Sequence, residues 1–215
     1  MNQVARFISV VFHPLLITTY LFIILSLFLP GILYPISPSK LFIGLIFLMT
    51  FVLPSLNFIF FKITGTIKDM QMFNRTDRVL PFSFITILYL VVTYMFYNNY
   101  HVPNVLKLME IITMMVIAST IITLFYKISV HSVASCGLIG ILLPLNNASE
   151  EGLLLYPTIG TVIIAGVVMS SRLQLNAHAI REVLYGGMMG FLIGMGGSDV
   201  AILISNSPLD SSVTL

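Results

Sequence analysis

Charged side chains are scarce in this sequence: only 8% of its 215 residues are Asp, Glu, Lys or Arg, whereas 58% are hydrophobic. A soluble domain of this length has to cover its surface with polar groups, and typical domains are about 25% charged. The mean hydropathy of +1.03 therefore excludes a soluble domain and predicts an integral membrane protein. The net charge of +2 is too small and too scattered to indicate nucleic acid as a partner.

Cysteine is also nearly absent, and the single Cys136 excludes an internal disulfide framework. There is no tandem repeat, low-complexity tract or linker, so we expect one domain over residues 1–204 and a polar tail over 205–215. The first apolar run is too long for the core of a signal peptide, and no small-residue cleavage site follows it cleanly. We interpret it as a retained membrane span.

Long hydrophobic runs recur along the whole chain. A helix needs about 20 mostly apolar residues to cross the hydrocarbon. This measure predicts an all-α integral membrane helix bundle of about seven spans, with six possible, near residues 7–30, 41–61, 81–98, 108–126, 132–146, 153–170 and 183–204. The segment LLPLNNASEEG, between the fifth and sixth spans, is typical of a turn.

Two spans carry further signals. His13 and Pro14 in the first span predict a kink beside a buried polar group. Gly186, Gly190 and Gly194 in the last span recur every four residues, which favours close approach of another membrane helix within the bundle or of a second copy.

Seven spans would place the N-terminus and the loops after spans 2, 4 and 6 on one side of the membrane. That side would hold eight of the ten basic residues, namely Arg6, Lys62, Lys68, Arg75, Arg78, Lys127, Arg172 and Arg181. The positive-inside rule would make it cytoplasmic. Basic residues that bind a ligand do not report topology. If Lys68, Arg75, Arg78 and Arg172 are set aside, four basic residues remain on this side of the membrane and two on the other.

The same side would collect three polar segments: KDMQMFNRTDRVLP (68–81), KISVH (127–131) and SRLQLNAHAIRE (171–182). Charged groups beside hydrocarbon are costly and usually functional. Each segment adjoins a predicted helix end, so a bundle can bring all three together. Their cations and histidines suit an anionic ligand.

His178 and Glu182 lie one helical turn apart. There the carboxylate can accept the Nδ1 proton and leave the Nε2 lone pair of the histidine exposed, which would make it a nucleophile. The pair can equally be a structural contact at a helix start, where an acid suits the helix dipole. A metal site is a third reading, but Arg172 and Arg181 would repel a cation.

The segment SRLQLNAHAIRE resembles the third signature of the type 2 phosphatidic acid phosphatase family, which runs serine, arginine, five residues, histidine, three residues, aspartate. Ser171, Arg172 and His178 stand at the matching positions, with Glu182 in place of the aspartate.

Two other segments match the family's remaining signatures in part and in the same order. The sequence ISVH at 128–131 is similar to the second signature, Pro-Ser-Gly-His. Lys68 and Arg75 are similar to the first, a lysine followed after six residues by Arg-Pro, with Thr76 where the proline would stand. The resemblance covers roughly residues 60–200.

The resemblance implies a metal-independent lipid phosphatase without a cofactor. His178 would form a phosphohistidine, Glu182 would hold its ring, and His131 would protonate the departing oxygen and then activate water. The residues that would hold the phosphoryl oxygens are Lys68, Arg75, Arg172 and Ser129, with Arg78 as a rival for Arg75. The expected partners are membrane lipids, with a lipid phosphate as substrate, and the implied location is a bacterial inner membrane.

Val130 replaces the glycine of the second signature, and a β-branched side chain hinders close approach of the backbone to phosphate. This departure, with Thr76, Glu182 and a seventh span, leaves open a second reading. The chain would then be a catalytically silent relative that serves as a lipid-binding or scaffold subunit of a larger membrane complex. A homodimer is a separate option for its assembly. A small transporter is a third option. Which lipid is bound, and on which side, stays open.

Overall fold

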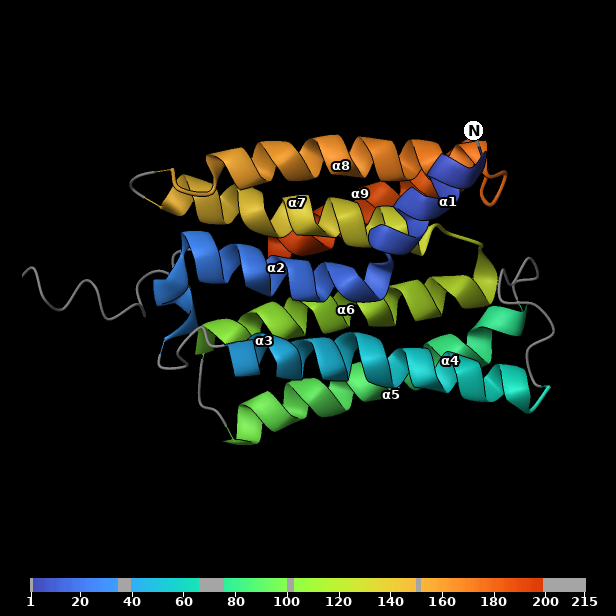
Figure 1. Cartoon of the computed structure of the whole chain (residues 1–215), viewed down its shortest axis with the longest axis horizontal. Coiled ribbons are helices and arrows are strands. Elements are labelled where there is room, and N and C mark those ends of the chain that lie inside the picture. The colour runs from blue at the N-terminus through green and yellow to red at the C-terminus, as the bar shows by residue number, and fades with distance from the viewer. Residues whose placement is uncertain (1, 35–39, 66–75, 100–102, 150–151, 199–215) are drawn as a thin grey trace, which may run out of the picture.

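The computed structural model describes residues 2–34, 40–65, 76–99, 103–149 and 152–198. Over these residues the protein is all-helical, as predicted, and has no β-strand. Its long helices run side by side along the long axis of the molecule and form one bundle (Figure 1).

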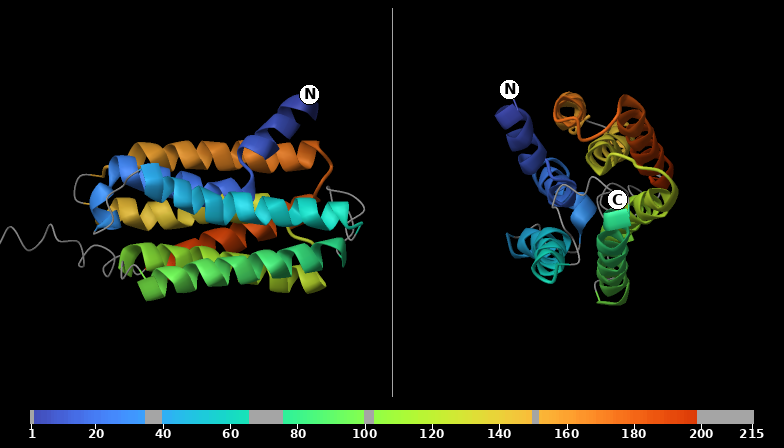
Figure 2. Two further views of the ribbon diagram at one scale, coloured as in Figure 1. Left: turned by 60° about the horizontal axis from the view of Figure 1, so that its bottom comes forward. Right: turned by 90° about the vertical axis from the view of Figure 1, so that its right-hand side faces the viewer.

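The first predicted span is broken in two. α1 (Asn2–Val11) and α2 (Pro14–Phe28) meet at an angle of 56°, and α1 leans away from the bundle (Figure 2). Pro14 has no N–H to continue the helix, and His13 before it takes an extended backbone with ψ of 138°. The predicted kink is confirmed. A short 3₁₀ turn, η1 (Pro30–Leu33), follows α2.

The second span runs from Lys40 to Ile63 and contains an irregular turn. α3 (Lys40–Phe47) passes through one π-helical turn, η2 (Leu48–Val52), into α4 (Leu53–Ile63). Pro54 cannot donate to the carbonyl of Thr50 four residues earlier, and the Tyr89 hydroxyl donates to that carbonyl instead, at 3.3 Å. A side chain from another helix therefore satisfies the interrupted backbone.

Five longer helices complete the bundle: α5 (Thr76–Asn99), α6 (Pro103–Phe125), α7 (Val130–Ala148), α8 (Leu155–Gln174) and α9 (Ile180–Gly197). The predicted turn after the fifth span begins too early, because Pro144 and the two asparagines after it lie inside α7. Proline is tolerated in membrane helices where neighbouring groups re-satisfy the backbone. The predicted sixth span is also too short, since α8 continues through Ser171 and Arg172.

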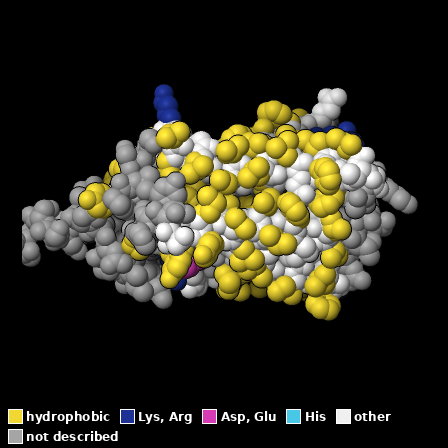
Figure 3. Space-filling model, turned by 90° about the horizontal axis from the view of Figure 1, so that it is seen from below, with side chains coloured by type: hydrophobic (Ala, Val, Ile, Leu, Met, Phe, Trp, Pro, Cys, Tyr) yellow, Lys and Arg dark blue, Asp and Glu magenta, His cyan; other side chains and the backbone are white. Residues whose placement is uncertain are grey.

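Among the residues that the structure describes, five helices are long and apolar enough to cross a membrane, and six if α1 and α2 are one broken span. Hydrophobic side chains spread along the face shown in Figure 3. These features are compatible with an integral membrane protein. The predicted number of seven is not confirmed, because α9 is not among these helices. It has Arg181 and Glu182 in its first turn and is rich in glycine.

α9 packs closely against α7 through its glycines. A Cβ on Gly190 would overlap the carbonyl oxygen of Val133, and one on Gly194 would lie 2.6 Å from the carbonyl oxygen of Gly137. Only glycine permits this backbone-to-backbone distance. The predicted small-residue face is thus an internal helix contact.

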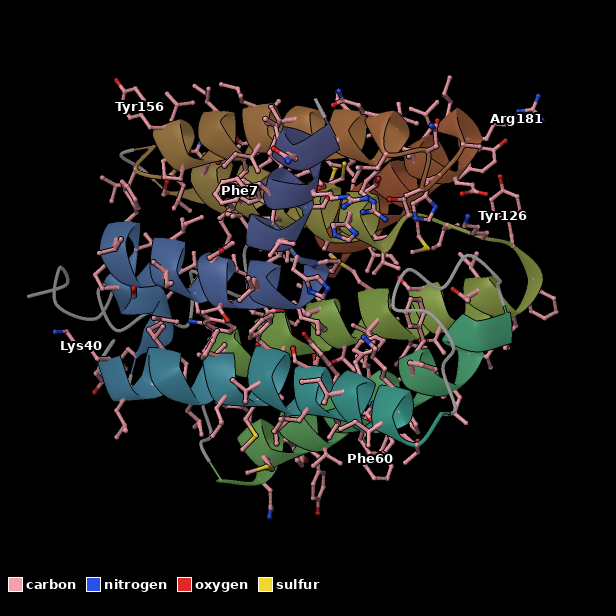
Figure 4. The ribbon with its side chains drawn as sticks, turned by 45° about the vertical axis from the view of Figure 1, so that its right-hand side comes forward. Phe7, Lys40, Phe60, Tyr126, Tyr156 and Arg181 are labelled. Atoms are coloured by element: carbon pink, nitrogen blue, oxygen red, sulfur yellow. The ribbon has the colours of Figure 1, made fainter. Side chains whose placement is uncertain are left out.

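The ends of several helices lie together at one end of the bundle. α4, α6 and α8 end there, and α5, α7 and α9 begin there, at the end where the N-terminus lies (Figure 1). We call it the site end. Lys62, Lys127 and Arg172 belong to it, whereas Lys40 lies at the opposite end (Figure 4).

Candidate functional site

The polar segment SRLQLNAHAIRE contains the turn between α8 and α9. The N–H of Ala177 donates to the carbonyl of Arg172 at 3.2 Å, and the N–H of Asn176 donates to that of Leu173 at 2.9 Å. This is the Schellman pattern of helix termination. Asn176 adopts the left-handed conformation that the pattern needs, with φ of 50°. The chain reverses here and brings the end of α8 beside the start of α9.

His178 follows this turn and contacts Glu182 in the first turn of α9. Nδ1 of His178 donates to the Oε2 atom of Glu182 at 2.7 Å, so in the neutral ring the Nε2 atom carries a lone pair and no proton. Oε2 also accepts from the N–H of Ala179 at 3.3 Å and lies 4.0 Å from Nζ of Lys127. The spacing of the two residues correctly predicted their contact. The His178 side chain is only 3% exposed.

Ser129 begins α7 and connects it to α9. Its N–H donates to the backbone carbonyl of Glu182 at 3.1 Å. Its hydroxyl accepts from the N–H of Ser132 at 3.4 Å and from the hydroxyl of Ser132 at 2.9 Å, as an N-cap does. Ser129 is fully buried as the N-cap of α7, and it is not among the residues that line the cavity described below. Its role in phosphate binding stays a prediction.

His131, in the first turn of α7, is held by the broken first span. Its Nε2 atom donates to the carbonyl of Ser9 at 3.1 Å. Ser9 lies in the last turn of α1, where carbonyls lack partners within the helix. The break at His13 therefore supplies the acceptor that fixes the ring of His131, and Nδ1 is the nitrogen left for a ligand.

A cavity of about 440 Å³ connects these groups. His13, His131, Arg172 and His178 line it, and we call these four the histidine cluster. Ile141 lines it as well, ten residues further along α7, or about 15 Å deeper into the bundle. The remaining wall is mostly apolar and includes Ile17, Leu21, Phe51, Phe58 and Ile85. The cavity thus extends from the polar histidine cluster at the site end into the hydrophobic interior of the bundle.

The other predicted cations are placed only in part. Lys68 and Arg75 lie outside the described residues, as does the side chain of Arg78 at the start of α5. α4 ends and α5 begins at the site end. Arg181 is exposed and points outward from the bundle, and it does not line the cavity with the histidine cluster (Figure 4).

Comparison with family models, curated proteins and solved structures found no match to the chain. Within the described part of the chain, no group of three or more His, Cys, Asp or Glu side chains is arranged to hold a metal ion.

The sequence did not predict that His13 belongs to the histidine cluster. His13 was expected to be a buried polar group at a kink, yet its ring lies 5.6 Å from that of His131, nearly perpendicular to it. The two residues are more than a hundred positions apart, and His13 belongs to none of the three polar segments. A histidine beside a proline inside an apolar span was the only available signal.

Proposed function

We propose that the protein is a membrane lipid phosphate or diphosphate phosphohydrolase that acts through a phosphohistidine, as its resemblance to the type 2 phosphatidic acid phosphatases implies. The observation that carries the proposal is the 2.7 Å hydrogen bond from His178 to Glu182 beside a cavity shared with His131 and Arg172. A histidine whose Nδ1 proton is held by a carboxylate keeps a nucleophilic lone pair on Nε2.

The chemistry would take two steps. Nε2 of His178 attacks phosphorus, the bond to the leaving oxygen breaks, and that oxygen takes a proton from Nδ1 of protonated His131. Water then gives a proton to the same Nδ1 and attacks phosphorus, which frees His178 and releases phosphate. Arg172 would stabilise the charge on the equatorial oxygens, with Lys68 and Arg75 or Arg78 as further cations.

The hydrophobic part of the cavity supports a lipid substrate. Its volume lies within the range of about 300–1,000 Å³ that is usual for small-molecule sites. A phosphate at the histidine cluster would leave the attached chain next to apolar walls such as Leu21 and Ile85. A soluble phosphate ester would gain nothing from this surface, whereas each buried CH₂ group contributes about 0.8 kcal/mol.

The test is phosphate release by the purified protein in detergent micelles. Phosphatidic acid, phosphatidylglycerol phosphate, an isoprenyl diphosphate and lipid A phosphates are compared with and without chelator. We expect chelator-resistant release from at least one lipid, and loss of that release in His178→Ala and His131→Ala. Acid-labile radiolabel retained from labelled substrate by the wild type and not by His178→Ala would identify the phosphohistidine.

A matched control is Arg181→Ala, a charge removal at the same end but outside the cluster. Its release rate should stay within about twofold of the wild type, because exposed charges contribute little. Release that persists in folded His178→Ala would contradict the proposed nucleophile.

One observation favours a second candidate, a silent relative that binds lipid phosphate as a scaffold. Val130 lines the cavity beside His131, where the family signature has glycine. A folded wild type that binds phosphatidic acid micelles but releases no phosphate from any lipid would support this candidate. Val130→Gly should then increase binding of the phosphate group.

We also propose that α9 is a seventh span, which would place the chain termini on opposite sides of the membrane. Reporters active on one side only, fused in turn to the N-terminus and after Leu215, test this. Activity of both fusions on the same side would contradict seven spans.

A further inference from the structure

His13 contributes a hydrogen-bond donor to the cavity. Its Nδ1 atom accepts from the N–H of Leu15 at 3.4 Å and so caps α2. A nitrogen that accepts a hydrogen bond carries no proton, and the proton of the neutral ring is therefore on Nε2. The break between α1 and α2 thus fixes the tautomer of His13 as well as the ring of His131.

His13 adjoins His131 in the cavity that both share with His178. The His13 ring lies 5.6 Å from that of His131 and 6.3 Å from that of Phe51. The three histidines come from separate parts of the fold, since His13 precedes α2, His131 is in α7 and His178 precedes α9.

The contact between His13 and His131 places His13 relative to the reaction if His178 is the nucleophile. The attacking and leaving atoms of a phosphoryl transfer lie roughly in line across phosphorus. His131 serves the leaving oxygen, so His13, next to His131, would lie beside the leaving group. A lipid monophosphate places only an alcohol and its carbon chain there. A lipid diphosphate places a second phosphate there.

We propose that His13 binds the second phosphate of a lipid diphosphate, and that lipid diphosphates are the preferred substrates. This inference rests on the proposed phosphohydrolase function. Nε2–H of His13 donates to an oxygen of the phosphate that departs with the lipid, and a donor to an anion makes a strong hydrogen bond. Arg172, which lines the same cavity as His13 and His131, would support the negative charge of the two phosphates.

The test compares a polyisoprenyl diphosphate with its matching monophosphate, measured as kcat/KM for phosphate release by the full chain in micelles. We expect the wild type to favour the diphosphate by at least about tenfold. His13→Asn keeps an N-cap acceptor but loses the donor at the Nε2 position. It should lower kcat/KM for the diphosphate by about tenfold and change that for the monophosphate by less than about twofold.

His13→Gln is the matched variant, because its amide nitrogen reaches the position of Nε2. It should restore kcat/KM for the diphosphate to within about threefold of the wild type. The thermal midpoint of His13→Asn should equal that of the wild type, which separates binding from folding. Equal losses on both substrates, or a wild type that favours the monophosphate, would overturn the role of His13. No release from either lipid would instead contradict the phosphohydrolase function itself.

Discussion

The two sides of the cavity are built in different ways. On one side, α7 and α9 approach until the backbone at Gly190 meets that at Val133. On the other side, α2, η2, α4 and α5 present large side chains such as Leu21, Phe51 and Ile85. The first side carries His131 and His178, while the second forms most of the apolar wall. Close backbone packing fixes the geometry of polar groups, whereas side chains across a wider space can shape room for a hydrocarbon chain.

The two sides also differ in which residues supply hydrogen bonds to backbone groups that lack a partner within their own helix. In the α7–α9 half, Ser129 and Glu182 hold the helix starts through local capping bonds. In the other half, the carbonyl freed by Pro54 is reached by Tyr89 from a helix far along the chain. Substitutions at the backbone contact between α7 and α9 should therefore disturb the placement of His131 and His178, and substitutions in the second half should alter the cavity.

The largest effect is expected at the α7–α9 contact. In Gly190→Ala the new methyl group overlaps the carbonyl oxygen of Val133, and backbone cannot yield as a flexible side chain can. We expect a loss of about 1–3 kcal/mol in the free energy of unfolding, measured by thermal unfolding in detergent, with a fall in phosphate release. Gly196→Ala is the control, because a Cβ there meets open space. Equal stability of the two variants would contradict the conclusion that close backbone packing distinguishes the α7–α9 side of the cavity.

A smaller effect is expected at the apolar wall. Ile85→Phe places a larger side chain into the cavity, so KM for a long-chain lipid should rise about fivefold, which corresponds to about 1 kcal/mol, with kcat unchanged. Ile87→Phe, on the same helix, is the control, since Ile87 is 57% exposed. A change in kcat without a change in KM would place Ile85 near the reacting groups and contradict a wall role.

The smallest effect on activity is expected at Ser129. Ser129→Ala removes the cap of α7 and should lower the free energy of unfolding by about 1 kcal/mol. Release of phosphate should stay within about threefold, because the hydroxyl bonds to Ser132 and does not line the cavity. Ser170→Ala, which removes an exposed hydroxyl from α8, serves as the control. A fall in kcat/KM without a loss of stability would instead assign Ser129 to phosphate binding.

Local patterns in the sequence predicted much of this architecture. Apolar run lengths gave the helical class, the glycine spacing gave a helix contact, and four-residue spacing gave the pair of His178 and Glu182. Helix ends were less predictable. Pro144 lies inside α7, and Arg172 lies in the last turn of α8. Whether a proline or a polar residue ends a helix depends on the groups that neighbouring helices supply.

The sequence by itself determined a bundle of long apolar helices with an acid beside a histidine, since hydropathy and helical periodicity are properties of neighbouring residues. Only the tertiary structure decided that His13 joins the cluster, that Ser9 holds His131 and that Ser129 is a cap. These depend on where a broken first span is packed against α7 and α8, and packing between segments distant along the chain leaves no periodic signal in either segment.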